Sequence, residues 1–229
     1  MKTPQMRVLA DENIPLVKTA FGALGAVRTL PGRSIRMADV READVLLVRS
    51  VTPVDAALLD GSNVRFVGSA TIGTDHIDQD YLRKQGIVFA HAPASNADSV
   101  ADYVIAALLQ LAVRHHVPLR GKTVGIVGRG NIGSRLARRF PALGLDVVVN
   151  DPPLAEAAGE LHDFVPLDAV LEQADIITLH VPLTKEGPHA THHLFGEATL
   201  RRMQPGAWLL NTSRGPVVDN AGLLRVLSD

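Results

Sequence analysis

Residues 123–133 read TVGIVGRGNIG, and this stretch decides the fold of the chain. An apolar run over residues 123–127 leads directly into a glycine-rich turn that ends at Gly133, and a helical pattern begins at once. A strand, the spacing G-x-G-x-x-G and a helix in this order are typical of the first half of a dinucleotide-binding βαβ unit. The stretch therefore predicts a parallel strand whose carboxyl end meets the start of a helix.

The three glycines of this turn have separate predicted roles. Gly128 permits the tight turn, Gly130 lets the backbone approach a pyrophosphate, and Gly133 lets the helix pack close to the strand. The helix N-terminus offers N–H groups and a positive dipole end to the phosphates. The spacing alone is a weak signal, but the strand before it and the helix after it support a dinucleotide cofactor.

An acidic residue follows the next predicted strand. The apolar run over residues 146–150 leads into Asp151. A carboxylate about 20 residues beyond the glycine turn binds the adenosine ribose hydroxyls, and it repels a 2′-phosphate. Asp151 therefore predicts NAD, rather than NADP, as the cofactor.

Outward from this unit, short apolar runs alternate with helical patterns along the whole chain. Most of these runs are continuous in Val, Ile and Leu, as in parallel strands that are covered on both faces. The alternation predicts an α/β protein with two doubly wound parallel-sheet (Rossmann or flavodoxin-like) domains. Strands are predicted at residues 7–11, 45–50, 65–70, 88–92, 123–128, 146–151, 175–181 and 207–212. Helices are predicted at residues 14–24, 79–85, 99–115 and 131–143.

The domain boundary is predicted where Pro93 and Asn96 interrupt the pattern. We assign residues 1–97 to the first domain and residues 98–229 to the second. The second domain is expected to be incomplete at its C-terminus, since the chain ends in a helical pattern with no strand after it.

Composition limits the classes of function. The net charge is −1, which gives no electrostatic reason to bind nucleic acid or an anionic membrane. Cysteine is absent, so disulfides, thiolate nucleophiles and cysteine-bound zinc are excluded, and a reducing, cytoplasmic compartment is expected. The N-terminus resembles no secretory signal.

Two further strand ends should border the cofactor, because ligands of open α/β sheets lie beyond the carboxyl ends of the strands. One contains His180 and Val181, and the other reads NTSRG over residues 211–215. A fixed guanidinium at Arg214 can hold a substrate carboxylate through two parallel hydrogen bonds. The alternative is an arginine in an ordinary surface turn.

The motifs VGIVGRGNIG, NDPP, HVPLT and NTSRGPVVD together resemble those of the D-2-hydroxyacid dehydrogenases. Four N-terminal segments narrow this resemblance to the branch of the family that oxidises 4-phospho-D-erythronate. These segments are VLADENIP (residues 8–15), LPGRSI (30–35), VRSVTPV (48–54) and FVGSATIGTDHID (66–78). The implied reaction moves a hydride from C2 of the substrate to NAD, giving 3-hydroxy-2-oxo-4-phosphobutanoate in vitamin B6 (pyridoxal 5′-phosphate) biosynthesis.

The resemblance implies roles for matching positions. Arg214 would be catalytic, binding the carboxylate and polarising the C2 oxygen, while Ser50 and Thr71 of the first domain would bind substrate. Turn and cap chemistry is the alternative for these two hydroxyls. The residues implied to touch NAD, besides the three glycines, are Asn131, Ile132, Asp151, Val181, Thr212, Ser213 and Arg214. Arg33 and Arg49 are candidates for the substrate phosphate.

The family's base, a histidine oriented by a glutamate, lies further along the chain than the arginine. None of the nine histidines matches it, so the chain is expected to be the N-terminal portion of a longer, homodimeric enzyme. Alone it should bind NAD weakly or not at all, and it should not turn over. His76 and His180 are interpreted as structural, with His180 hydrogen-bonded to the backbone. His189, His192 and His193 lack the spacing of a zinc-protease site, so no metal is expected.

Two alternatives stay open at this point. One is another D-2-hydroxyacid dehydrogenase, for example one that acts on 3-phosphoglycerate. The other is a non-catalytic NAD-binding remnant or sensor on the same fold.

Overall fold

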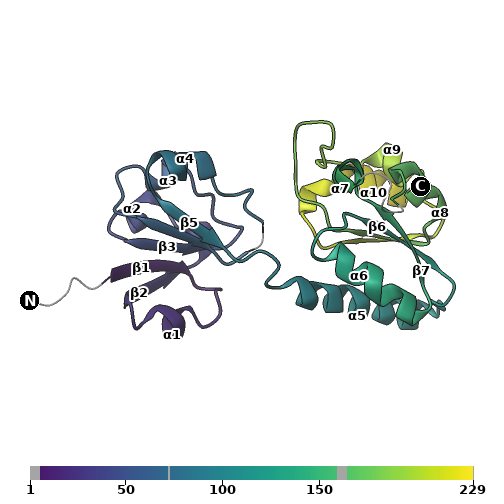
Figure 1. Cartoon of the computed structure of the whole chain (residues 1–229), viewed down its shortest axis with the longest axis horizontal. Coiled ribbons are helices and arrows are strands. Elements are labelled where there is room, and N and C mark those ends of the chain that lie inside the picture. The colour runs from purple at the N-terminus through teal and green to yellow at the C-terminus, as the bar shows by residue number, and fades with distance from the viewer. Residues whose placement is uncertain (1–5, 72, 159–163, 229) are drawn as a thin grey trace, which may run out of the picture. The chain divides into compact units, whose positions relative to one another are not determined.

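The computed structural model describes residues 6–71, 73–158 and 164–228. The chain divides into two compact units, Met1–Ser95 and Asn96–Asp229 (Figure 1). The predicted boundary between residues 97 and 98 lies two residues beyond this division.

The first unit contains a five-stranded parallel sheet in the order β2-β1-β3-β4-β5. This is a flavodoxin-like order: β2 lies on one side of β1, and the later strands β3, β4 and β5 follow on the other side. Its strands are β1 (Met6–Asp11), β2 (Gly25–Leu30), β3 (Val45–Val48), β4 (Phe66–Ser69) and β5 (Val88–His91). Its helices are α1 (Val17–Phe21), α2 (Met37–Val40), α3 (Ala56–Leu59) and α4 (Gln79–Lys84).

The edge strand β2 was not among the predicted strands, and the helix predicted over residues 14–24 is shorter than expected. The helix α1 covers only Val17–Phe21, since Leu16 has a left-handed backbone with φ 57°. β2 reads GAVRTL, in which arginine and threonine interrupt the apolar residues. An edge strand has a neighbour on one side only, so it does not need the continuous apolar run by which the central strands were recognised.

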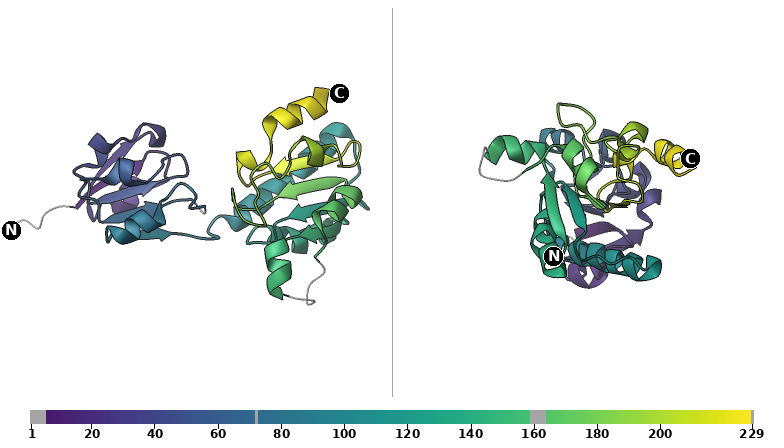
Figure 2. Two further views of the ribbon diagram at one scale, coloured as in Figure 1. Left: turned by 90° about the horizontal axis from the view of Figure 1, so that it is seen from above. Right: turned by 90° about the vertical axis from the view of Figure 1, so that its right-hand side faces the viewer.

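The second unit contains a four-stranded parallel sheet in the order β7-β6-β8-β9. Its strands are β6 (Thr123–Val127), β7 (Asp146–Asn150), β8 (Ile176–Leu179) and β9 (Trp208–Asn211). Its helices are α5 (Ala97–His115), α6 (Gly133–Arg139), α7 (Pro152–Ala158), α8 (Leu167–Gln173), α9 (Glu197–Leu200) and α10 (Asn220–Ser228). In Figure 2, α7 and α10 lie on opposite sides of this unit.

Helices cover both faces of the second sheet. On one face, Leu108 of α5 and Leu136 of α6 join Ile126 of β6 in one buried apolar cluster. On the other face, Leu171 of α8 belongs to a second cluster with Ile177 of β8. The predicted class, parallel sheets covered by helices on both faces, is thereby confirmed.

The helix predicted over residues 131–143 is interrupted. α6 ends at Arg139, and a 3₁₀ helix, Phe140–Leu143, follows it. Pro141 lacks the N–H that an α-helix needs at this point, and its ring clashes with the preceding turn. Within residues 6–71, 73–158 and 164–228, no helix has both the length and the apolar character that a membrane span requires.

Candidate functional site

The three glycines of the turn between β6 and α6 differ in what surrounds them. Gly128 has φ 95°, and a Cβ added there would lie 2.8 Å from the carbonyl oxygen of His180. A Cβ at Gly133 would lie 2.0 Å from the carbonyl oxygen of Gly128. At Gly130, in contrast, a Cβ would meet nothing within 4 Å. Two glycines are thus required by the fold, while the third borders open space.

The middle of the turn is exposed and both of its ends are buried. Gly130 and Asn131 are exposed, Ile132 is half-buried and Gly133 is buried. The Asn131 carbonyl accepts a hydrogen bond of 2.7 Å from Nη1 of Arg135, which fixes the first turn of α6. The exposed part of the turn therefore lies at the N-terminal end of α6, where backbone N–H groups attract an anion.

Asp151 directly follows β7 and is held by two backbone groups. Its Oδ2 accepts a hydrogen bond of 2.7 Å from the N–H of Arg129, and its Oδ1 accepts one of 3.1 Å from the N–H of Leu154. The first contact ties the carboxylate to the glycine turn, and the second caps α7. A carboxylate can accept about four hydrogen bonds, so each oxygen keeps capacity for a ribose hydroxyl.

His180, after β8, is held between two threonine hydroxyls. Its Nε2 lies 2.8 Å from Oγ1 of Thr178, and its Nδ1 lies 3.3 Å from Oγ1 of Thr212, after β9. Burial lowers the pKa of His180 to about 4, so the imidazole is neutral near neutral pH. Backbone partners had been predicted for this side chain. The observed partners are hydroxyls, because β8 and β9 pair in parallel and bring residues 178 and 212 to the same ring.

The segment around Arg214 is shaped by Asn211, the last residue of β9. Its Oδ1 accepts hydrogen bonds from the N–H and the hydroxyl of Ser213, at 3.0 and 2.8 Å. Its Nδ2 donates to the Arg214 carbonyl at 2.9 Å. Nη1 of Arg214 itself donates to the Ser213 carbonyl at 3.1 Å. Asn211 is therefore a supporting residue, and its position in the NTSRG motif alone does not indicate this role.

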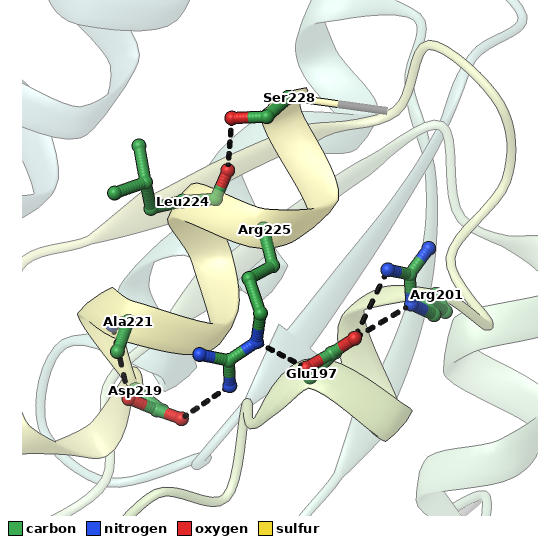
Figure 3. A network of polar contacts seen from close by, with 7 residues as sticks. All are labelled: Glu197, Arg201, Asp219, Ala221, Leu224, Arg225 and Ser228. Atoms are coloured by element: carbon green, nitrogen blue, oxygen red, sulfur yellow. Dashed lines mark hydrogen bonds and ion pairs between the residues drawn. The ribbon is translucent and has the colours of Figure 1, made fainter.

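The chain after Arg214 is fixed by a polar network between α9 and α10 (Figure 3). Glu197 accepts hydrogen bonds from Nη2 of Arg201 at 3.0 Å and from Nε of Arg225 at 2.5 Å. Asp219 lies 4.0 Å from Nη2 of Arg225 and accepts the N–H of Ala221 at 3.0 Å. Through Asp219, the network anchors the end of the segment that carries Arg214.

Val181 lies beside the glycine turn. A Cβ added at Gly128 would be 3.0 Å from Cγ1 of Val181. Its side chain also packs against the buried apolar cluster that contains Val127. The valine therefore closes the side of the turn that faces β8.

Ser50 and Thr71 belong to the first unit, and each follows one of two paired strands. Val48, at the end of β3, is in register with Ser69, at the end of β4, so both loops leave the same edge of the sheet. Ser50 is exposed. The hydroxyl of Thr71 lies 3.0 Å from that of Ser69, which also lies 3.4 Å from Nε2 of His76.

The loop of Arg33 is attached to the loop of Arg49. Thr52 is 2% exposed, and its hydroxyl donates to the Gly32 carbonyl at 2.9 Å. Arg33 is exposed and Arg49 is half-buried. The two arginines are therefore on neighbouring loops, near the end of β3 that carries Ser50.

The C-terminal histidines have other partners than a metal. Nε2 of His189 lies 2.9 Å from Oε1 of Glu156, and the rings of His192 and His193 stack with their centroids 3.9 Å apart. In the described part of the chain, no three histidine or acidic side chains are grouped as metal ligands would be.

A strand, a glycine turn, a helix and a carboxylate after the next parallel strand are the arrangement of a dinucleotide-binding unit of a dehydrogenase. Residues 83–229 match the sequence model of the D-isomer specific 2-hydroxyacid dehydrogenase, NAD binding domain. The chain belongs to this family, and the matched residues include its NAD-binding domain.

Two curated relatives and one solved structure illustrate the similarity. Erythronate-4-phosphate dehydrogenase of Salinibacter ruber is 65% identical over 222 residues, covering 96% of this chain and 57% of the relative. That of Chromohalobacter salexigens is 57% identical, covering 95% of this chain and 57% of the relative. D-lactate dehydrogenase from Aquifex aeolicus, solved with NAD and lactic acid, has a TM-score of 0.77 at 28% identity, covering 97% of this chain and 73% of that one. The chain thus spans 57% of the length of these two curated relatives.

Proposed function

We propose that the whole protein oxidises 4-phospho-D-erythronate at C2 with NAD, giving 3-hydroxy-2-oxo-4-phosphobutanoate for vitamin B6 biosynthesis. The observation that carries this proposal is the 65% identity with a relative named erythronate-4-phosphate dehydrogenase. The open space at Gly130 and the fixed carboxylate of Asp151 support the cofactor.

NAD would be held by the glycine turn, by Asp151 and by the strand ends that carry Val181 and residues 212–214. Gly130 and Asn131 would lie along the pyrophosphate, and Asp151 would accept hydrogen bonds from the adenosine ribose. When bound, NAD accepts the hydride. The neutral, hydroxyl-bonded imidazole of His180 keeps Thr212 in place beside it.

The substrate is anionic at both ends, and the chain offers cations for both. Arg214 would hold the carboxylate and polarise the C2 oxygen. Ser50 and Thr71 would donate hydrogen bonds from the first unit, and Arg33 and Arg49 would bind the phosphate. The loop contact between Thr52 and Gly32 supports this pairing of arginines.

We assign the acid–base step to no described residue. His180 is the histidine next to the cofactor site, but a group with a pKa of about 4 is a weak base near neutral pH. The family resemblance implies a histidine and a glutamate at later positions of the whole protein. We also propose that this protein is a cytoplasmic homodimer, which sedimentation and cell fractionation would test.

The test compares two phosphorylated hydroxy acids. Whole protein is incubated with NAD and either 4-phospho-D-erythronate or 3-phosphoglycerate, and NADH is followed by absorbance. We expect turnover with the first substrate and little with the second. Faster turnover of 3-phosphoglycerate would contradict the proposed substrate.

Replacing Arg214 tests the proposed catalytic residue. Arg214→Lys keeps the charge but loses the planar pair of donors, so kcat/KM should fall by about a hundredfold or more. Arg138→Lys, at an exposed position of α6, is the matched control. An unchanged rate in Arg214→Lys would remove Arg214 from the mechanism.

A further inference from the structure

The glycine turn carries a cation that the proposed NAD site does not use. Arg129 stands between Gly128 and Gly130, and its Cζ lies 5.6 Å from the ring centroid of Phe164. A guanidinium within about 6 Å of an aromatic ring is attracted by the negative face of the ring. The Arg129 side chain is therefore directed toward Phe164.

Phe164 is itself fixed beside the strand that leads to Asp151. It forms an isolated parallel bridge with Val149 of β7. The N–H of the next residue, Val165, donates to the Val149 carbonyl at 2.8 Å, and Asn150 Nδ2 donates to the Val165 carbonyl at 2.8 Å. The ring thus holds the guanidinium near the carboxyl end of β7.

The same arginine is bonded to the carboxylate that should select the cofactor. The backbone N–H of Arg129 donates to Oδ2 of Asp151 at 2.7 Å. A cationic side chain and an anionic side chain therefore lie at one strand end, where the adenosine ribose would be bound. NAD and NADP differ there by one phosphate, which a carboxylate repels and a guanidinium attracts.

We propose that Arg129 is a specificity-determining residue whose guanidinium, held on Phe164 beside Asp151, recognises the 2′-phosphate of NADP. The preference for NAD then results because the carboxylate of Asp151 repels the 2′-phosphate more strongly than the guanidinium of Arg129 attracts it. This inference rests on the proposed cofactor site. It adds that the preference for NAD over NADP is smaller than Asp151 would give without Arg129. Removal of the carboxylate should expose the preference of Arg129.

The test is a cycle of variants in the whole protein. The dissociation constants of NAD and NADP are measured for each variant by ligand-observed NMR. Asp151→Ser should improve NADP binding relative to NAD by about tenfold. Adding Arg129→Met should reverse that gain and leave NAD binding within about twofold of Asp151→Ser alone. In Asp151→Ser, NADP binding should also weaken with added salt, and Arg129→Met should reduce this dependence.

Two controls keep the cycle interpretable. Arg138→Met removes an exposed cation from α6, and it should leave the NADP/NAD ratio unchanged. Arg129→Lys keeps the charge, and in the Asp151→Ser background it should retain part of the gain in NADP binding. This variant replaces Arg129→Met in the test if Arg129→Met does not fold. An NADP/NAD ratio that is the same in Asp151→Ser with and without Arg129 would overturn the inference and leave Arg129 as a structural contact of Phe164.

Failure of the proposed function would look different. If the whole protein binds neither cofactor at millimolar concentration, both the cofactor site and the inference fail. If the cofactors bind as expected but the whole protein does not oxidise 4-phospho-D-erythronate, only the proposed substrate fails.

Discussion

Acidification should destabilise the second unit through His180. Its pKa in the folded protein is about 4, below the ordinary value of 6.5, because burial disfavours the charged ring. The unfolded chain therefore binds more protons between these two values. Stability is fully present above the unfolded pKa and is lost as the pH falls from 6.5 toward 4.

The magnitude follows from the two pKa values. Relative to about pH 7, linkage predicts a loss of about 2 kcal/mol at about pH 5 and about 3 kcal/mol at about pH 4. A shift of this size is a large fraction of the stability of a typical domain. Both hydroxyls can accept a hydrogen bond from a protonated ring nitrogen, so the lowered pKa of His180 results from burial and not from a missing acceptor.

The assay is urea unfolding followed by the fluorescence of Trp208, the single tryptophan, which lies on β9 of the same sheet. The free energy of unfolding is measured across this pH range for the wild type, for His180→Asn and for His116→Asn. His116 is exposed with φ 54°, a conformation that asparagine tolerates, so its variant controls for loss of a histidine. Parallel pH profiles for the wild type and His180→Asn, or an NMR titration midpoint of His180 near 6.5, would refute the reasoning.

Two further predictions concern the loops of the site. Gly133→Ala should destabilise the second unit by about 1–3 kcal/mol or more, because the new Cβ would meet the Gly128 carbonyl. Gly130→Ala should leave the free energy of unfolding in urea nearly unchanged, but it should weaken NAD binding. Equal loss of stability in both variants would contradict this division. Thr52→Val should lower the free energy of unfolding of the first unit in urea by about 1–2 kcal/mol, because the buried Gly32 carbonyl loses the hydroxyl that donates to it. Thr52→Ser keeps a hydroxyl and should retain most of this free energy. Equal stability of the valine and serine variants would show that the hydroxyl is unimportant.

The sequence was most informative where a feature depends on neighbours in the chain. The strands β6 and β8 have continuous apolar runs because both of their faces are covered, and both were predicted. The edge strand β2 was not, because Arg28 and Thr29 interrupt its apolar residues. The glycine turn was recognised from its spacing, since the tight turn at Gly128 and the close packing at Gly133 each require a missing side chain.

Contacts between distant residues were not accessible in this way. The enclosure of His180 depends on the pairing of β8 with β9, which places Thr212 next to a ring 32 residues earlier in the chain. The contact between Arg129 and Phe164 depends on a short bridge beside β7. No local pattern in the sequence marks either pair of residues. Only the three-dimensional arrangement shows that His180 is buried and neutral and that Arg129 lies against Phe164.

The contrast among the three glycines has a consequence for the evolutionary record of this fold. Gly128 and Gly133 are enforced by backbone atoms of the protein itself, whereas Gly130 faces open space. In a lineage that no longer used a dinucleotide, selection on residue 130 would cease first, while the outer two glycines would persist for folding alone. A descendant that has lost its cofactor would therefore still carry two glycines of the motif, and the middle position would be the one to examine for lost function.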